Sequence, residues 1–130
     1  MKILVTSGGT SEAIDSVRSI TNHSTGRLGK IITETLLAAG HEVDLITTKR
    51  ALKPEAHPNL SILEITNTKD LLLEMQERVA DYQVLIHSMA VSDYTPVYMT
   101  GLEEVQASSN LEEFLNKQNH QAKISSTDEV

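Results

Sequence analysis

Short apolar runs that alternate with helical patterns constrain the fold of this chain more than any other feature. The first run, Lys2–Thr6, stops at Ser7-Gly8-Gly9-Thr10, as a buried strand does before a tight turn. Further strands are expected at Glu42–Thr47, Leu60–Ile65 and Val84–Ile86. Strands that alternate with helices form parallel sheets covered on both faces. We therefore predict an α/β fold, a Rossmann-like three-layer sandwich with a mainly parallel sheet.

Two helices are expected between these strands. The first begins at Gly26 and stops at Gly40. Its apolar stripe is predicted to be Leu28, Ile32, Leu36 and Ala39. The second is expected to have Thr68 as its cap, with Leu71, Met75 and Val79 on one face. A third, short helix is expected near Asn110–Lys117, within a flap-like excursion over residues 95–122.

Composition narrows the class of protein. A length of 130 residues suits a single domain, and a net charge of −7 with few aromatic residues argues against nucleic-acid binding. The absence of cysteine excludes disulfides, Cys-ligated zinc and a thiol nucleophile, and the five histidines lack metal-ligand spacing. No apolar run reaches membrane length, and we expect no signal peptide because Met1 leads directly into the first strand. We expect a cytoplasmic domain without a protein-ligated metal.

Glycine and positive charge gather in the first 40 residues. Five of the six glycines lie there, and the net charge of residues 1–40 is +1 (four basic against three acidic side chains). Residues 41–130 carry seven basic and fifteen acidic side chains, a net charge of −8. The glycine-rich part is therefore the one region that does not repel an anion.

Two glycine-rich segments are candidates for binding phosphate. Gly8 and Gly9 follow a buried strand, where a backbone without Cβ atoms lets an anion approach the N–H groups. Ser24-Thr25-Gly26-Arg27-Leu28-Gly29 opens a helix, whose N-terminus favours phosphate. The alternatives are an ordinary turn, and a helix cap with a glycine for helix–strand packing. Together the two segments favour nucleotide binding.

Familiar nucleotide motifs do not match. The glycines are split between two segments, and Leu45-Ile46-Thr47-Thr48 offers no acidic residue for a ribose. Gly29-Lys30 is followed by Ile31 rather than Ser or Thr, which excludes a P-loop. A short-chain dehydrogenase would need a Tyr-x-x-x-Lys pair, which is absent.

The segment between the two glycine clusters places Arg18 and Asn22 four residues apart. An arginine can grip carboxylate or phosphate with two hydrogen bonds, and an asparagine amide can donate to a developing oxyanion. A surface salt bridge for Arg18 and a turn at Asn22 are equally consistent with the spacing. His23 has no orienting carboxylate beside it, so we interpret it as a spacer.

Several segments in order resemble one family. They are Ser7-Gly8-Gly9-Thr10, Ile14-Asp15-x-Val17-Arg18, Asn22-His23-Ser24-Thr25-Gly26-Arg27-Leu28-Gly29 and Ala90-Val91-Ser92-Asp93-Tyr94, and the similarity resumes at Lys123-Ile124. The chain resembles phosphopantothenoylcysteine synthetase (phosphopantothenate–cysteine ligase) of coenzyme A biosynthesis, in its bacterial monofunctional type. The resemblance implies that phosphopantothenate attacks CTP with Mg²⁺, forming an acyl-cytidylate and pyrophosphate. Cysteine then attacks the acyl group and releases CMP.

The resemblance also implies roles for individual residues. Asn22 would hold and polarise the activated acyl group, and Lys123 would meet the triphosphate from the flap, so these two are the catalytic candidates. The nucleotide-binding candidates are Gly8, Gly9, Ser24, Gly26, Gly29, His87, Ser88, Met89, Asp93 and Lys123. The substrate-binding candidates are Arg18, Asn22, Ala90 and Asp93. Arg18 would reach the neighbouring site of a homodimer, and Mg²⁺ would be held mainly by the nucleotide phosphates.

The resemblance further implies that this chain is the N-terminal part of a ligase domain spanning residues 1–130 here, with its C-terminal remainder absent. Two other classes of function stay open. One is an NAD(P)-dependent Rossmann-type oxidoreductase, and the other is a non-catalytic nucleotide-binding module.

Overall fold

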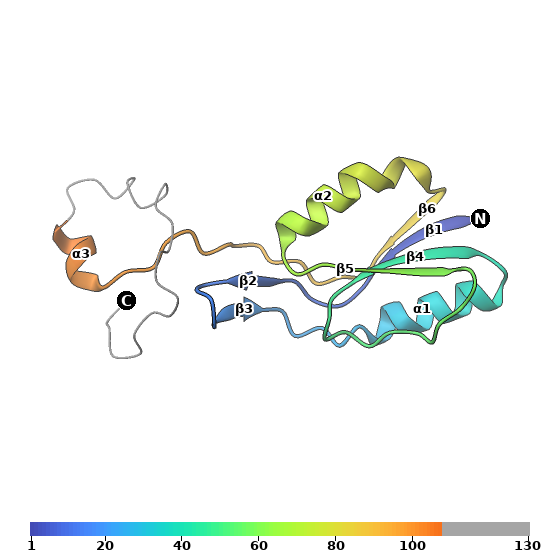
Figure 1. The fold of residues 1–130 in the computed structure, drawn as a ribbon, viewed down its shortest axis with the longest axis horizontal. Coiled ribbons are helices and arrows are strands. Elements are labelled where there is room, and N and C mark those ends of the chain that lie inside the picture. The colour runs from blue at the N-terminus through green and yellow to red at the C-terminus, as the bar shows by residue number, and fades with distance from the viewer. Residues whose placement is uncertain (108–130) are drawn as a thin grey trace. The chain divides into compact units, whose positions relative to one another are not determined.

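A computed structural model describes residues 1–107 of the chain. Four strands form a parallel sheet in the order β5-β4-β1-β6 (Figure 1). They are β1 (Lys2–Thr6), β4 (Glu42–Thr47), β5 (Leu60–Glu64) and β6 (Val84–His87). The predicted strands and their parallel arrangement are confirmed, with ends that differ by one residue in β5 and β6.

Side chains of β1 alternate between two hydrophobic cores, one on each face of the sheet. Ile3 and Val5 belong to a cluster with Leu37 of helix α1 (Arg27–Ala38). Leu4 lies in the other cluster with Leu71 of helix α2 (Thr68–Arg78). Figure 1 shows the two helices on opposite faces of the sheet. This is the predicted three-layer α/β sandwich, and it follows from a central strand that is apolar on both faces.

The apolar stripe predicted for α1 is confirmed at Ile32 and Leu36, which pack against the core, and is wrong at Leu28 and Ala39. Leu28 is 64% exposed, whereas the buried residues of the helix are Gly29, Thr33 and Leu37. A Cβ atom at Gly29 would lie 2.3 Å from the Ser7 Cβ, so the helix touches the end of β1 through its smallest residue. This contact sets the rotation of the helix. Ile32 and Leu36 still pack at the side of the core, and Ala39 is the exposed C-cap.

The cap predicted for α2 is also wrong by one residue. Asn67, not Thr68, is the N-cap, and its side chain accepts a hydrogen bond from the Asp70 backbone N–H at 2.8 Å. The Asp70 carboxylate accepts in return from the Asn67 N–H, which completes a capping box. Leu71 is buried as predicted, but Val79 belongs to the short 3₁₀ helix η1 (Val79–Asp81) and is 41% exposed.

The remaining described elements are a hairpin and a short helix. Strands β2 (Ser11–Ala13) and β3 (Ser19–Thr21) pair with each other, and α3 spans Leu102–Ala107. The contacts of the chain divide it into two units, one made of Met1–Ser11 and Thr21–Ser92, the other of Glu12–Ile20 and the chain from Asp93 onward. The predicted helix at Asn110–Lys117 lies outside the described residues. Within residues 1–107, no helix is long and apolar enough to cross a membrane.

Candidate functional site

Three segments that are far apart in the sequence meet beyond the carboxyl ends of β1 and β6. Gly9 forms a parallel bridge with Ala90, where the Thr10 N–H donates to the Ala90 carbonyl at 3.0 Å. The Ala90 N–H donates to the Gly8 carbonyl at 2.8 Å, and the Asn22 N–H donates to the Thr10 carbonyl at 3.1 Å. The structure thus brings together Gly8, Gly9, Asn22 and Ala90, at the edge of a parallel sheet where ligands commonly bind.

Gly9 is required for the contact between this turn and the Asn22 segment. A Cβ atom there would lie 2.5 Å from the backbone oxygen of Asn22 and 3.0 Å from its Cβ. Any side chain at position 9 would therefore push the Asn22 segment away from the turn. The close approach of the Asn22 backbone therefore requires glycine at position 9.

The second glycine cluster holds the N-terminus of α1 against the end of β1. Gly26 is the N-cap with φ +80°, and the buried Ser7 hydroxyl donates to its carbonyl at 3.2 Å. A Cβ atom at Gly29 would lie 2.2 Å from the Ser7 Oγ. The structure therefore shows the alternative given above, in which Gly26 caps the helix and Gly29 allows the helix to pack against the strand. Phosphate binding by Gly26, Gly29 and the half-buried Ser24 stays a prediction, supported by the N–H groups that a first helical turn leaves without helical partners.

The Asn22 side chain is half-buried and faces inward. Its amide nitrogen lies 3.2 Å from the Ser92 Oγ and 3.4 Å from the Thr10 Oγ1. It also lies 3.4 Å from the backbone oxygens of Thr10 and Ala90. All of these groups belong to the same unit of the chain. Asn22 is thus held by two segments, the turn that contains Thr10 and the stretch that contains Ala90 and Ser92.

The end of β6 is tied to β1 through hydroxyl groups. The Thr6 Oγ1 and the His87 Nδ1 lie 2.5 Å apart, and the Ser88 hydroxyl donates to the Thr6 carbonyl at 2.6 Å. Met89 is buried in the core on the α2 face. These three predicted nucleotide-binding residues lie near the glycine turn, but of the three only His87 is exposed.

Arg18 and Asp93 belong to the other unit of the chain. The Arg18 guanidinium forms an ion pair with the Asp15 carboxylate at 2.9 Å, and Asp15 also accepts from the Arg18 N–H at 2.7 Å. The salt-bridge alternative for Arg18 is therefore present in the structure, and its role toward a substrate stays a prediction. Asp93 is exposed, and Lys123 lies outside the described residues.

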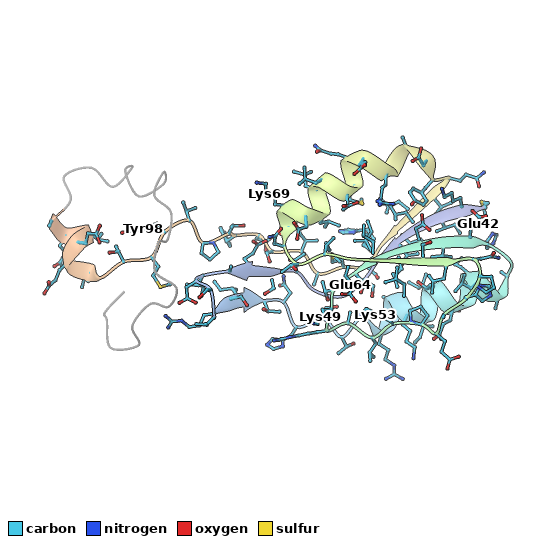
Figure 2. The ribbon with its side chains drawn as sticks, viewed as in Figure 1. Glu42, Lys49, Lys53, Glu64, Lys69 and Tyr98 are labelled. Atoms are coloured by element: carbon cyan, nitrogen blue, oxygen red, sulfur yellow. The ribbon has the colours of Figure 1, made fainter. Side chains whose placement is uncertain are left out.

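The loop after β4 contributes residues that the sequence analysis missed. The methyl group of Ala51 is the close neighbour of both Gly8 and Gly26, because a Cβ atom would approach it within 2.9 Å at Gly8 and 2.8 Å at Gly26. The Lys53 ammonium donates to the carbonyls of Thr48, Lys49 and Ala51 at 2.9–3.1 Å and lies 3.5 Å from a Glu64 carboxylate oxygen. Figure 2 shows Lys49, Lys53 and Glu64 near one another, away from Glu42 at the start of β4. Lys49, Arg50 and Lys53 follow the strand closely in the sequence, and this basic run was the signal that could have indicated the loop.

The donor groups of the site suit anions better than cations. The turns offer N–H and O–H groups, and within residues 1–107 no three His, Cys, Asp or Glu side chains gather as they would around a metal ion. The described residues therefore offer no side-chain cluster that would hold Mg²⁺ by itself.

Comparison with known proteins gives a match along most of the chain. The family model described as the DNA/pantothenate metabolism flavoprotein C-terminal domain matches residues 1–121. The crystal structure of the DNA/pantothenate metabolism flavoprotein from Streptococcus pneumoniae is 92% identical, with a TM-score of 0.90, over 100% of this chain and 57% of that one. The C-terminal domain of a coenzyme A biosynthesis bifunctional protein CoaBC is 35% identical, with a TM-score of 0.67, over 75% of this chain and 48% of that one.

Curated relatives are longer than this chain. The coenzyme A biosynthesis bifunctional protein CoaBC of Thermococcus kodakarensis is 37% identical over 95 residues, which are 72% of this chain and 23% of that protein. The matched region thus spans about a quarter of the length of such relatives.

Proposed function

Because the chain belongs to the DNA/pantothenate metabolism flavoprotein C-terminal domain family, we propose that the protein joins phosphopantothenate to cysteine at the expense of CTP. In the first step a phosphopantothenate carboxylate oxygen bonds to the α-phosphorus of CTP, and pyrophosphate leaves. In the second step the cysteine amine bonds to the acyl carbon of the acyl-cytidylate. The bond from that carbon to the phosphate oxygen breaks, the amine loses a proton and CMP is released.

One observation carries the proposal. Gly9, Asn22 and Ala90 lie side by side at the carboxyl edge of the sheet, joined by backbone hydrogen bonds of 3.0 and 3.1 Å to Thr10. An uncharged amide beside glycine turns suits a reaction in which both substrates are anions, since a carboxylate there would repel them. The neighbouring N–H groups at the start of α1 are suited to the nucleotide phosphates.

The other roles in this proposal rest on the family. Arg18 would contact phosphopantothenate at the neighbouring site of a homodimer, Asp93 would contact nucleotide and substrate, and Lys123 would meet the triphosphate. Mg²⁺ would arrive on the nucleotide phosphates, where it lowers the charge that the attacking carboxylate meets. The chain itself would orient the two reacting carbonyl and phosphoryl centres.

A coupled pyrophosphate assay tests this function. With phosphopantothenate present, we expect pyrophosphate release with CTP and weaker release with ATP, and CMP release only after cysteine is added. Tight NADPH binding without CTP-dependent pyrophosphate release would instead favour an oxidoreductase. Binding of CTP and phosphopantothenate without any acyl-cytidylate would favour a non-catalytic module.

The variant Asn22→Asp tests the site within this function. We expect it to fold, and we expect its ligation rate to fall roughly 100-fold. The carboxylate repels the anionic substrates, and the amide that should contact them is gone. Asn59→Asp makes the same chemical change at an exposed position of the β4–β5 connection and is the matched control. Equal turnover in the two variants would remove Asn22 from the site.

A further inference from the structure

The orientation of the Asn22 amide is determined by its neighbours. Two of the groups within 3.4 Å of Nδ2 are backbone carbonyls, those of Thr10 and Ala90. A carbonyl oxygen only accepts hydrogen bonds, so an amide rotated by 180° would set three oxygens against one another. The NH₂ group therefore faces the protein. The amide oxygen Oδ1 has no hydrogen-bond partner among the described residues.

The hydroxyl protons of Thr10 and Ser92 follow from the same reasoning. The fully buried Thr10 Oγ1 accepts from the Ser92 backbone N–H at 2.9 Å and from the Asn22 amide at 3.4 Å. These two bonds use both of its lone pairs. In its 2.8 Å contact with Ser92, Thr10 must then be the donor. The Ser92 oxygen thus accepts from Thr10 and from Asn22, and its own proton is left to donate elsewhere.

We propose that Thr10 is a positioning residue and that Ser92 both positions Asn22 and contacts the ligand, so that the Asn22 amide oxygen is held toward the ligand. This proposal rests on the function proposed above and changes one assignment within it. The edge of the site then presents one acceptor, the Asn22 Oδ1, and one donor, the Ser92 hydroxyl. Such a pair recognises an amine or amide N–H beside an acyl oxygen. Asn22 accepts from the N–H of the attacking amine, and the Ser92 hydroxyl donates to the acyl oxygen.

This assignment differs from the one made from sequence, in which the asparagine donates to an oxyanion. Its two N–H groups are already directed at Thr10, Ala90 and Ser92, so donation to a ligand would require the amide to leave four neighbours. A positioned acceptor for an amine also keeps the lone pair of the nitrogen directed at the acyl carbon.

Three variants and one control test the proposal in the purified protein. Thr10→Val removes the hydroxyl and keeps the shape, whereas Thr10→Ser keeps the hydroxyl. Ser92→Ala removes the other hydroxyl at a half-buried position, and it replaces Thr10→Val in the test if that variant does not fold. Thr33→Val is the matched control, because Thr33 is also fully buried and its Oγ1 has no hydrogen-bond partner among residues 1–107.

The first measurement does not depend on ligase activity. It is the rate at which the Asn22 side-chain NH₂ protons exchange with water, followed by ¹⁵N–¹H NMR and assigned by their loss in Asn22→Asp. We expect slow exchange in the wild type, Thr10→Ser and Thr33→Val, and exchange roughly tenfold faster in Thr10→Val and Ser92→Ala, where hydrogen bonds to the amide are lost. Unchanged exchange in Thr10→Val and Ser92→Ala would overturn the proposal.

The second measurement is ligation with cysteine as the varied substrate. Thr10→Val and Ser92→Ala should lower kcat on the order of 10- to 100-fold, while Thr10→Ser and Thr33→Val stay near wild type. Equal kcat in Thr10→Val and Thr33→Val would contradict the positioning role. If the wild type itself forms no amide, the proposed ligase function fails, and the NMR measurement still decides whether Thr10 and Ser92 hold Asn22.

Discussion

The contact between α1 and the end of β1 makes Gly29→Ala a demanding test of this structure. Helix propensity alone predicts a gain, since alanine is better than glycine inside a helix by about 1 kcal/mol. The structure predicts a loss. The new Cβ would lie 2.3 Å from the Ser7 Cβ and 2.2 Å from its Oγ, whereas carbon atoms in contact are normally ~3.5–4.0 Å apart.

The size of the loss follows from this overlap. Ser7 is fully buried and its Cβ is fixed to the backbone, so a rotamer change cannot relieve the contact and the helix must shift by more than ~1 Å. Overpacking of this kind costs up to about 3 kcal/mol. Subtracting the propensity gain leaves a net loss of about 2 kcal/mol in the free energy of unfolding.

Urea unfolding measures this difference, with Ser7→Gly as the second member of a double-mutant cycle. Ser7→Gly removes the atoms that the new methyl group would strike, so the double variant should recover on the order of 1–2 kcal/mol relative to the sum of the single changes. A more stable Gly29→Ala protein, or strictly additive changes, would refute the close approach of α1 to β1.

Two further predictions concern other parts of the fold. Burial, followed by the hydrogen bond to Asp44, raises the pKa of Tyr82 from 10.0 to about 12, so folding stability should be fully present below pH 10 and decline as pH rises toward 12. Thermal melts at pH 8–12 check this, and a decline of the same steepness in Tyr82→Phe would exclude Tyr82 as its source. Lys53→Met should lower the free energy of unfolding by about 2 kcal/mol, because three loop carbonyls lose their hydrogen bonds to the Lys53 ammonium. The control Lys49→Met, at an exposed position, should change the free energy of unfolding by no more than about 0.5 kcal/mol.

The strands and their parallel arrangement could be predicted because the signals are local, whereas the strand order β5-β4-β1-β6 comes from the structure. Each strand is an apolar run with a polar or glycine stop beside it, and the intervening helical spacing requires crossover connections. The family resemblance carried by the glycine segments and Asn22 is confirmed by the match over residues 1–121. The structure brings Gly9, Asn22 and Ala90 together, and their roles toward a ligand stay predictions.

The features that sequence reasoning missed depend on contacts between distant residues. The face of α1 is set by Gly29 against Ser7, which helical spacing does not contain. The β2–β3 hairpin has no apolar alternation and no two-residue glycine turn, and the Asp15 carboxylate holds its turn instead by accepting from the Val17 and Arg18 N–H groups. Lys53 was missed because three of its four partners are backbone carbonyls, which every residue type offers.

The acyl-cytidylate is the species that tests the account most directly. The protein is incubated with phosphopantothenate and CTP but without cysteine, quenched and examined by mass spectrometry, with Asn22→Asp and Asn59→Asp alongside. The account predicts a mass that joins phosphopantothenate to CMP in the wild type and in Asn59→Asp, and its conversion to the cysteine amide when cysteine is added. CTP binding with no such species at any time, or amide formation by Asn22→Asp as fast as by Asn59→Asp, would contradict it.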